Sequence, residues 1–327
     1  MSFILTAGGV VLLLLAGTAL VHGASALAAR YGVPPMVVGL TVVAFGTSSP
    51  ELVVNIVGAL RGETDLAFGN IAGSNIANLG LVLGAAALIH PMTIQGQLVR
   101  RELPLLLLGT TVLLVLILDL PLLNQPPVLT MADGLVLLLL FSVFVYFTVK
   151  DFVDQKYDAL MADIREIEGK LPSSPASGTL ALWGYIGFGI AGLALGGHMT
   201  ITGGSSLAEA MGVPPVIIGM FVIGVGTSLP ELVTSIIAAL NDESDLCVGN
   251  VVGSNLFNAL VVLPISTLFA PVAVPAGGVM DILVSLALCA LLLPIFFFGN
   301  TRMNRTVGLT FVVIYLGYMV FRSLYSV

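Results

Sequence analysis

Long apolar stretches separated by short polar connections make up most of the chain. Ten of them are long enough to cross a bilayer at about 1.5 Å of rise per helical residue: 3–28, 36–60, 66–89, 103–120, 128–149, 179–206, 215–240, 246–270, 280–299 and 306–326. This pattern predicts an all-α membrane protein with about ten transmembrane helices. The composition agrees, because 57% of the 327 residues are hydrophobic and only 9% are charged, whereas soluble domains carry about 25% charged residues.

An internal repeat divides these helices into two sets. GTSSPE begins at Gly46 and GTSLPE begins 180 positions later at Gly226, and the same offset relates GSNIAN at 73–78 to GSNLFN at 253–258. Each copy holds about five helices, and an odd number of crossings sends the second copy into the membrane from the opposite side. We therefore expect an inverted pair of five-helix repeats.

The mixed-charge segment 151–178 is the natural linker between the repeats, which occupy 1–150 and 179–327. Under a model with the N-terminus outside, nine of the eleven basic residues fall on the inner side: Arg30, Arg100, Arg101, Lys150, Lys156, Arg165, Lys170, Arg302 and Arg305. Only Arg61 and Arg322 fall outside. Because cytoplasmic loops are enriched in Lys and Arg, we expect both termini outside and the linker in the cytoplasm.

The remaining composition narrows the class of protein. Lys and Arg form no basic stripe, so no nucleic-acid partner is expected, and neither a protein partner nor a cofactor is indicated. Cys247 and Cys289 lack metal-site spacing and are expected as small core residues. Residues 1–28 lack the basic start of a secretory signal, and VHGASALAARYGVPP recurs internally as ITGGSSLAEAMGVPP, so we expect this segment to be retained. An enzyme is not indicated, because HExxH is absent and no nucleophile, base and orienting residue recur together.

The repeated hexapeptide places a proline and a glutamate inside an apolar span. Pro50 lacks an N–H and crowds the carbonyl of Gly46, so the helix is expected to bend or break there, and Pro230 acts likewise on Gly226. A carbonyl without a donor is costly in hydrocarbon, so such a break persists where protein, water or an ion replaces the donor. The pattern therefore predicts a polar cavity at membrane depth.

Oxygen-bearing residues gather around both breaks and in the helix after each break. A spacing of four residues places Thr47 with Glu51, and Ser74 with Asn78, on shared helix faces. The candidate ligands are Ala44 through its carbonyl, Thr47, Ser48, Glu51, Ser74 and Asn78, and in the second copy Gly224, Thr227, Ser228, Glu231, Ser254 and Asn258. Hard cations take such ligands, while zinc, copper and iron sites recruit His or Cys. The set suffices for one calcium ion or several sodium ions.

Glu51 and Glu231 are the only carboxylates expected deep within spans, where each costs about 2.5–3.5 kcal/mol or more to insert. Two neighbouring carboxylates at low dielectric cannot both stay ionised, so one takes a proton unless a cation arrives. One divalent cation neutralises both, and two or more monovalent cations can replace it. Such mutually exclusive binding is what an antiporter requires, with one half moving against the other to alternate access.

Other polar residues have simpler interpretations. Ser and Thr in membrane helices often bond only to the carbonyl four residues earlier, so the hydroxyls near the breaks do not decide the matter alone. Asn78 and Asn258 also suit interhelical contacts, although their spacing from the two serines favours ligation. Four further asparagines lie on other helix faces and are interpreted as structural: Asn70, Asn75, Asn250 and Asn255.

With these motifs in view, the sequence resembles the sodium/calcium exchangers of the calcium:cation antiporter superfamily, in a short prokaryotic form. The likeness is most specific at GTSSPE with GNIAGSNIAN and at GTSLPE with GNVVGSNLFN. It implies electrogenic exchange of Na⁺ for Ca²⁺ across a prokaryotic inner membrane, with the first and sixth helices sliding across a central bundle. It also implies carbonyl ligands at Ala44 and Gly224 and carboxylate ligands at Glu51 and Glu231. Some relatives carry Asp where this chain has Asn258, which argues against potassium cotransport.

Two other functions remain open from the sequence. A proton/calcium antiporter would load protons onto the same pair of glutamates. A passive channel would also use broken helices and inverted repeats, but its flux would not depend on a counter-ion.

Overall fold

The computed structural model describes residues 2–93, 101–122, 126–166, 178–212, 226–298 and 302–325. Up to residue 166 the helices are α1 (Ser2–Tyr31), α2 (Pro35–Val38), the π-helical turn η1 (Gly39–Val43), α3 (Ala44–Thr47), α4 (Ser49–Arg61), α5 (Thr64–Ala77), the π-helical turn η2 (Asn78–Val82), α6 (Leu83–Ile89), α7 (Leu103–Leu122) and α8 (Met131–Glu166). From residue 178 on they are α9 (Thr179–Ala210), α12 (Leu229–Leu240), α13 (Ser244–Phe257), the π-helical turn η5 (Asn258–Val262), α14 (Leu263–Thr267), α15 (Gly278–Phe298) and α16 (Arg305–Tyr325). Four short strands join them: β1 (Met92–Thr93), β2 (Val128–Leu129), β3 (Val272–Ala273) and β4 (Arg302–Met303).

The expected spans are present as helices wherever the structure describes them. In that part of the chain six helices are long and apolar enough to cross a membrane, and a seventh span results if the bent pair 35–47 and 49–61 counts as one. Three shorter apolar helices, α7, α12 and α15, occupy further expected spans. The prediction of an all-α membrane protein is therefore confirmed. The first part of the expected span 215–240 lies outside the described residues, up to position 225.

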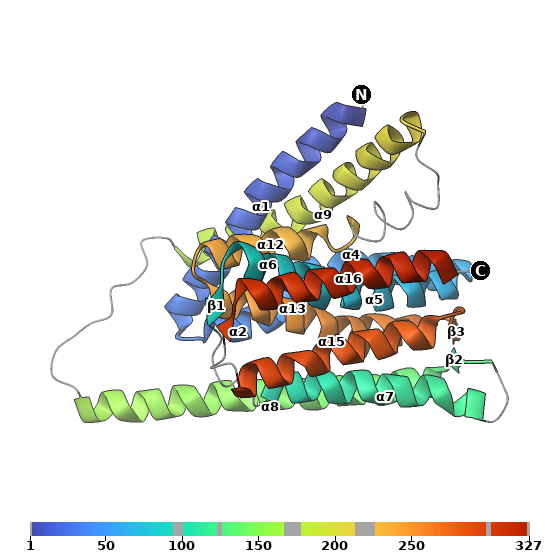
Figure 1. Cartoon of the computed structure of the whole chain (residues 1–327). Coiled ribbons are helices and arrows are strands. Elements are labelled where there is room, and N and C mark those ends of the chain that lie inside the picture. The colour runs from blue at the N-terminus through green and yellow to red at the C-terminus, as the bar shows by residue number, and fades with distance from the viewer. Residues whose placement is uncertain are drawn as a thin grey trace.

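The helix α8 runs further than the sequence pattern indicated. Its apolar part ends at Lys150, but the helix continues to Glu166, so the first part of the expected linker loop is helical. Residues 151–166 contain neither Gly nor Pro, and charged helix-forming residues extend a helix readily once it has begun. Figure 1 shows the result as a long helix along one side of the molecule.

The helices α1 and α9 lie side by side (Figure 1) and meet backbone to backbone. A Cβ atom added at Gly9 would lie 2.8 Å from the Gly196 carbonyl, and one at Gly196 would lie 3.0 Å from the Gly9 carbonyl. A Cβ at Gly189 would lie 2.9 Å from the backbone nitrogen of Leu20. Small residues permit this close approach, which is a common way for membrane helices to associate without a hydrophobic driving force.

Two antiparallel ribbons tie the interhelical connections together. β1 pairs with β4 through Met92 and Met303, and β2 pairs with β3 through Leu129 and Val272. β1 and β3 are separated by the 180-residue offset of the repeat, yet they lie at opposite ends of the helical body (Figure 1). This placement supports an inverted relationship between the two copies.

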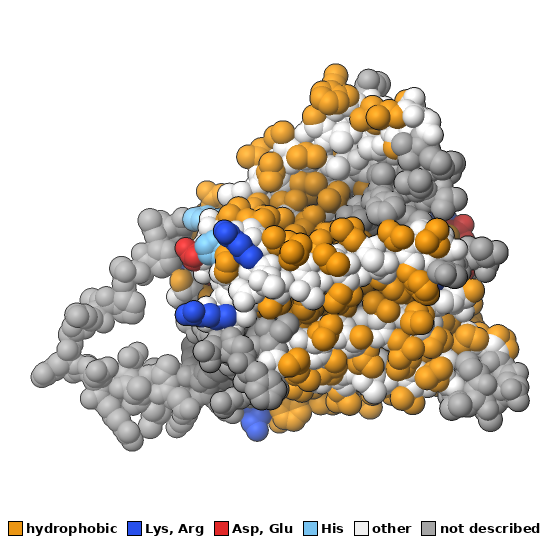
Figure 2. All heavy atoms as spheres, viewed as in Figure 1, with side chains coloured by type: hydrophobic (Ala, Val, Ile, Leu, Met, Phe, Trp, Pro, Cys, Tyr) orange, Lys and Arg blue, Asp and Glu red, His pale blue; other side chains and the backbone are white. Residues whose placement is uncertain are grey.

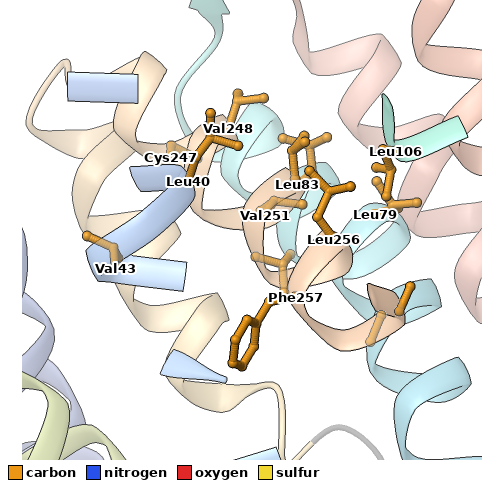
Figure 3. Packing of buried hydrophobic residues seen from close by; sticks show 14 of the residues in the cluster. Leu40, Val43, Leu79, Leu83, Leu106, Cys247, Val248, Val251, Leu256 and Phe257 are labelled. Carbon is orange, nitrogen blue, oxygen red and sulfur yellow. The ribbon is translucent and has the colours of Figure 1, made fainter. Parts of the chain in front are cut away.

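The segment α13–η5–α14 forms the centre of the protein, enclosed by the other helices. Leu40 of η1 packs beside Cys247 and Val248 of α13 (Figure 3). Gly249 permits this approach, because a Cβ there would lie 2.7 Å from the Met36 carbonyl. Cys247 is free and buried, as is Cys289, so both cysteines are core residues as expected.

The outer surface matches a lipid environment. In the view of Figure 2, hydrophobic side chains cover the flank of the helical body, while Lys, Arg and His side chains gather towards one end. Leu309, Val313 and Leu316 of α16 are among the exposed apolar residues of that flank. Such a surface is unfavourable in water and favourable in a bilayer.

Candidate cation site

The helix is broken at both copies of the hexapeptide, as predicted. α3 ends at Thr47 and α4 begins at Ser49, with a bend of 45° between the two halves of the span. Ser48 and Ser228 take nearly the same non-helical conformation, with φ of −89° and −88° and ψ of 6° and 7°. Each proline lies in the first turn of the following helix. N–H groups in a first turn have no acceptor within their own helix, so the absence of this group from proline costs that helix no hydrogen bond.

The two glutamates therefore lie in the first turns of α4 and α12. Free backbone N–H groups and the helix dipole favour negative charge at this position. Glu51 is 1% exposed and Glu231 is 0% exposed. The sequence thus places both carboxylates at helix starts that lie within the protein, where a cation is the natural counter-charge.

The Ala44 carbonyl, a predicted ligand, keeps its helical donor, because it accepts the N–H of Ser48 at 3.0 Å. It also lies 3.3 Å from the Thr47 hydroxyl, which can donate either to it or to Asn250 Oδ1. The second lone pair of the Ala44 carbonyl is open to a ligand when the Thr47 hydroxyl donates to Asn250. The Gly46 carbonyl, which cannot receive an N–H from the proline of the hexapeptide, accepts another backbone N–H at the C-terminal cap of α3.

Contacts between the repeats bring the predicted residues together. Ser48 Oγ donates to Glu231 Oε1 at 3.0 Å, so the first break touches the carboxylate of the second. Ser48 is the N-cap of α4, so this bond brings the Glu231 carboxylate to the helix start that carries Glu51. The hydroxyls of Thr47 and Ser254 lie 3.4 Å apart.

The equivalent hydroxyls of the other copy, Ser74 and Thr227, also lie 3.4 Å apart. Either oxygen of each pair can be the donor. Four elements thus contribute to one centre: the breaks at Ser48 and Ser228 and the helices α5 and α13. This is the convergence of two helices per repeat that the spacing predicted.

Several buried polar atoms of this centre have no hydrogen-bond partner among the described residues. They are both carboxylate oxygens of Glu51, Oε2 of Glu231, Oγ of Ser228, both polar atoms of the Asn78 amide, and Oδ1 of Asn258. A buried acceptor without a partner is costly and rare in proteins. A cation bound among these oxygens would satisfy them, so the residues present fit a hard cation.

The chemical nature of the centre limits which ion it suits. Within the described residues no group of three or more His, Cys, Asp or Glu side chains is placed to hold a metal. Two carboxylates supplemented by hydroxyl, amide and carbonyl oxygens make a set for hard cations. Gly224, the remaining predicted ligand, lies outside the described residues.

The asparagines interpreted as structural make contacts that join the repeats. Asn75 Nδ2 donates to the Asn255 carbonyl at 3.4 Å, and Asn255 Nδ2 donates to the Asn75 carbonyl at 3.1 Å. Asn258 Nδ2 donates to Asn75 Oδ1 at 3.2 Å. The reciprocal bonds connect α5 with α13 at the residues that directly follow Ser74 and Ser254, which are predicted ligands.

The other pair supports the helices on either side of the centre. Asn250 accepts from the Thr47 hydroxyl at 3.2 Å and donates to Ser235 at 3.1 Å. Its equivalent, Asn70, donates to Asn55 at 2.8 Å. Sequence reasoning missed Asn55 and Ser235, although both are fully buried and the two lie 180 positions apart, which is a signal for a repeated role.

Two further carboxylates, those of Glu102 and Asp281, are buried, but they lie at helix ends and not deep within spans. Glu102, beside the start of α7, is 1% exposed and forms an ion pair with Arg101 at 3.1 Å. Asp281 in the first turn of α15 accepts from Tyr318 and forms an ion pair with Arg322 at 3.1 Å. Both lie near helix ends and have positive partners, which separates them from the central pair.

A buried cluster of oxygen-bearing residues at the broken helices of a helical membrane protein is typical of a membrane cation transporter. Comparison with known proteins agrees. The sequence profile of the family described as "Sodium/calcium exchanger protein" matches residues 1–150 and 181–324. The chain belongs to this family, which consists of transporters and not of enzymes.

Relatives and solved structures agree with this assignment over nearly the full length. The chain is 34% identical to "Putative antiporter CaxA" of Alkalimonas amylolytica over 95% of each chain, and 28% identical to "Sodium/calcium exchanger MaX1" of Methanosarcina acetivorans over 98% of this chain and 97% of the relative. It is 35% identical to "Inner membrane protein YrbG" of Escherichia coli over 80% of this chain and 78% of the relative. Its fold matches the solved structure of the sodium-calcium exchanger NCX_Mj with a TM-score of 0.80 and 25% identity over 98% of each chain.

Proposed function

We propose that the protein is a secondary active antiporter that exchanges Na⁺ for Ca²⁺ across a membrane. The observation that carries this proposal is the burial of Glu51 and Glu231 at helix starts that the Ser48–Glu231 bond connects, with carboxylate oxygens that have no partner among the described residues. Membership of the sodium/calcium exchanger family supports it, as does the fold shared with NCX_Mj.

The proposed ligands are the twelve residues that the repeat predicts: Ala44, Thr47, Ser48, Glu51, Ser74, Asn78, Gly224, Thr227, Ser228, Glu231, Ser254 and Asn258. The carboxylates supply the charge, and the hydroxyl, amide and carbonyl oxygens complete the coordination. Calcium takes six to eight oxygens in flexible geometry, which a site assembled from four elements can provide.

Electrostatics explains why the two ions exclude each other. A single Ca²⁺ neutralises both carboxylates, and Na⁺ ions must occupy the same oxygens to do so. Leaving both carboxylates charged and unpaired in this buried centre is strongly unfavourable. The transporter without a bound ion therefore does not readily change its facing state. After it carries Ca²⁺ across the membrane, it must bind Na⁺ to return.

The arrangement in the cell is part of the proposal. The excess of Lys and Arg in the loops expected on one side supports a cytoplasmic position for 151–178 and an outer position for both termini. A prokaryotic inner membrane is supported by the Escherichia coli relative, which is named an inner membrane protein. In that setting the inward sodium gradient would drive calcium out of the cell.

A proton/calcium antiporter is the second candidate. It is favoured by the Glu51 carboxylate, which is buried with neither oxygen hydrogen-bonded in the described part of the chain. Such a group can exchange a proton for a cation directly. The two candidates differ only in the ion that returns.

The test is calcium uptake by purified protein reconstituted in sealed vesicles. We expect an outward sodium gradient to drive uptake, and a protonophore that collapses any pH difference to leave it intact. Uptake driven by a pH gradient alone would establish the proton antiporter instead. Calcium flux that proceeds at the same rate with no counter-ion would indicate a channel and refute both antiport proposals.

A further inference from the structure

Most contacts of the centre obey the repeat. The hydroxyl pairs Thr47–Ser254 and Ser74–Thr227 are equivalent by the 180-residue offset and have the same spacing of 3.4 Å. The reciprocal bonds between Asn75 and Asn255 are equivalent as well. The centre therefore has a nearly two-fold symmetric frame, against which any unequal contact stands out.

One amide contact is unequal. Asn258 Nδ2 donates to Asn75 Oδ1 at 3.2 Å. The equivalent bond would run from Asn78 Nδ2 to Asn255 Oδ1, but within the described residues neither of these buried atoms has a partner. Both the donor and the acceptor of the equivalent bond therefore lack a partner, so the two repeats differ at this contact.

A second contact is unequal in the same sense. Ser48 donates to Glu231 at 3.0 Å. The equivalent hydroxyl of Ser228 has no partner in the described part of the chain, and neither has the carboxylate of Glu51. In this state, Asn258 and Glu231 from the second repeat are hydrogen-bonded, and Asn78 and Glu51 from the first are not.

We propose that Asn75 and Asn255 are positioning residues. Asn75 orients the amide of Asn258 toward the cation in one facing state, and Asn255 orients the amide of Asn78 in the other. Asn75 takes the N–H of Asn258, which fixes that amide with its oxygen, Oδ1, left free as a ligand. Asn255 does the same for Asn78 in the opposite facing state. The inference rests on the proposed antiport, because it assigns which amide ligates the ion on each side of the membrane.

The physical argument combines the unequal contacts with the repeat. An amide fixed through its N–H cannot rotate, so its oxygen is pre-organised for a cation. Inverted repeats exchange their conformations when a transporter changes facing state. The bond from Asn258 to Asn75 in the present state is therefore replaced, in the opposite facing state, by the equivalent bond from Asn78 to Asn255. Asn255 Oδ1, which has no partner among the described residues, is the acceptor for that bond.

The test compares Asn75→Ala with Asn255→Ala in purified protein reconstituted in one orientation. The half-saturating calcium concentration is measured on each face by calcium–calcium exchange, which needs neither sodium nor a pH gradient. Each variant should raise this concentration roughly three- to tenfold on one face only, and the two variants should do so on opposite faces. Both variants lose one bond to the partner's backbone carbonyl, so a merely structural role would give equal effects on both faces. That result would overturn the proposal.

Two further variants keep the proposal testable if either alanine variant does not fold. Asn258→Ala and Asn78→Ala remove the presented amides, and each should raise the half-saturating calcium concentration on the face where its partner's variant would. In a folded Asn75→Ala background, Asn258→Ala should add little, whereas Asn78→Ala should add its full effect. Full additivity of both pairs would contradict the assignment. Failure of sodium-driven uptake alone would leave this result unaffected, since calcium–calcium exchange does not depend on the driving ion.

Discussion

At the scale of single residues, Glu51 and Glu231 differ in their surroundings although the repeat makes them equivalent. Glu231 accepts from Ser48, whereas both oxygens of Glu51 lack partners in the described residues. Neither carboxylate forms an ion pair with another described residue. Both carboxylates are therefore expected to be required for transport and dispensable for folding.

The matching prediction concerns Glu51→Gln and Glu231→Gln. Each removes one of two charges that face the cation, and we expect sodium-driven calcium uptake to fall about 100-fold or more, with unchanged yield of folded protein. Glu209→Gln is the control, since Glu209 is exposed on α9 and should leave uptake unchanged. Uptake at the wild-type rate in either site variant would show that the carboxylates have been wrongly assigned.

The sequence predicted these residues because the repeat selects them. A polar residue that recurs with its neighbours at a fixed offset indicates a function more strongly than a single serine or proline in a membrane helix does. The offset of 180 related Glu51 to Glu231 without structural information. The sequence does not predict which atoms of Asn75 and Asn258 bond, because that depends on the rotation of side chains between two helices. The sequence also did not predict the ion pair of Asp281 with Arg322, because these residues are far apart in the chain.

At the scale of elements, the helix breaks were predictable and the π-helical turns were not. Proline dictates a break through its own covalent structure. The turns at η1, η2 and η5 contain an extra residue that no local motif requires, and η2 and η5 begin at the site residues Asn78 and Asn258. Such turns are frequent at functional sites, but their position follows from packing between helices.

The contact between α1 and α9 gives a prediction at this scale. Gly189→Ala would place a methyl group 2.6 Å from the Leu20 side chain and 2.9 Å from its backbone, so the two helices must separate. We expect a loss of about 1–3 kcal/mol of stability, measured by thermal unfolding in detergent. Gly184→Ala on the same helix is the matched control, because Gly184 is exposed with nothing within 4 Å. Equal melting temperatures for the two variants would contradict the proposed close packing.

At the scale of the whole molecule, the placement of the two ribbons supports the prediction of an inverted pair of halves. Repeat-related connections must then open on opposite sides of the membrane. Arg61 is the last residue of α4, and Asn241 directly follows the repeat-related helix α12. Both are exposed, so each can report which side of the membrane its helix end faces.

The corresponding prediction uses Arg61→Cys and Asn241→Cys in intact cells. An impermeant maleimide should label the first variant from outside and the second only after the membrane is permeabilised. The parent protein is the control, since Cys247 and Cys289 are buried and should not react. Labelling of both variants from one side would mean that the halves are parallel and that the orientation derived from Lys and Arg is wrong.

The central claim is that both halves of the chain bind one and the same ion. The most direct measurement is anomalous diffraction from crystals soaked in calcium. We predict a peak within about 2.3–2.6 Å of carboxylate oxygens from both Glu51 and Glu231. A calcium ion held only elsewhere, for example in the polar cavity between His90 and Asp242, or no ion at concentrations that saturate transport, would contradict the account.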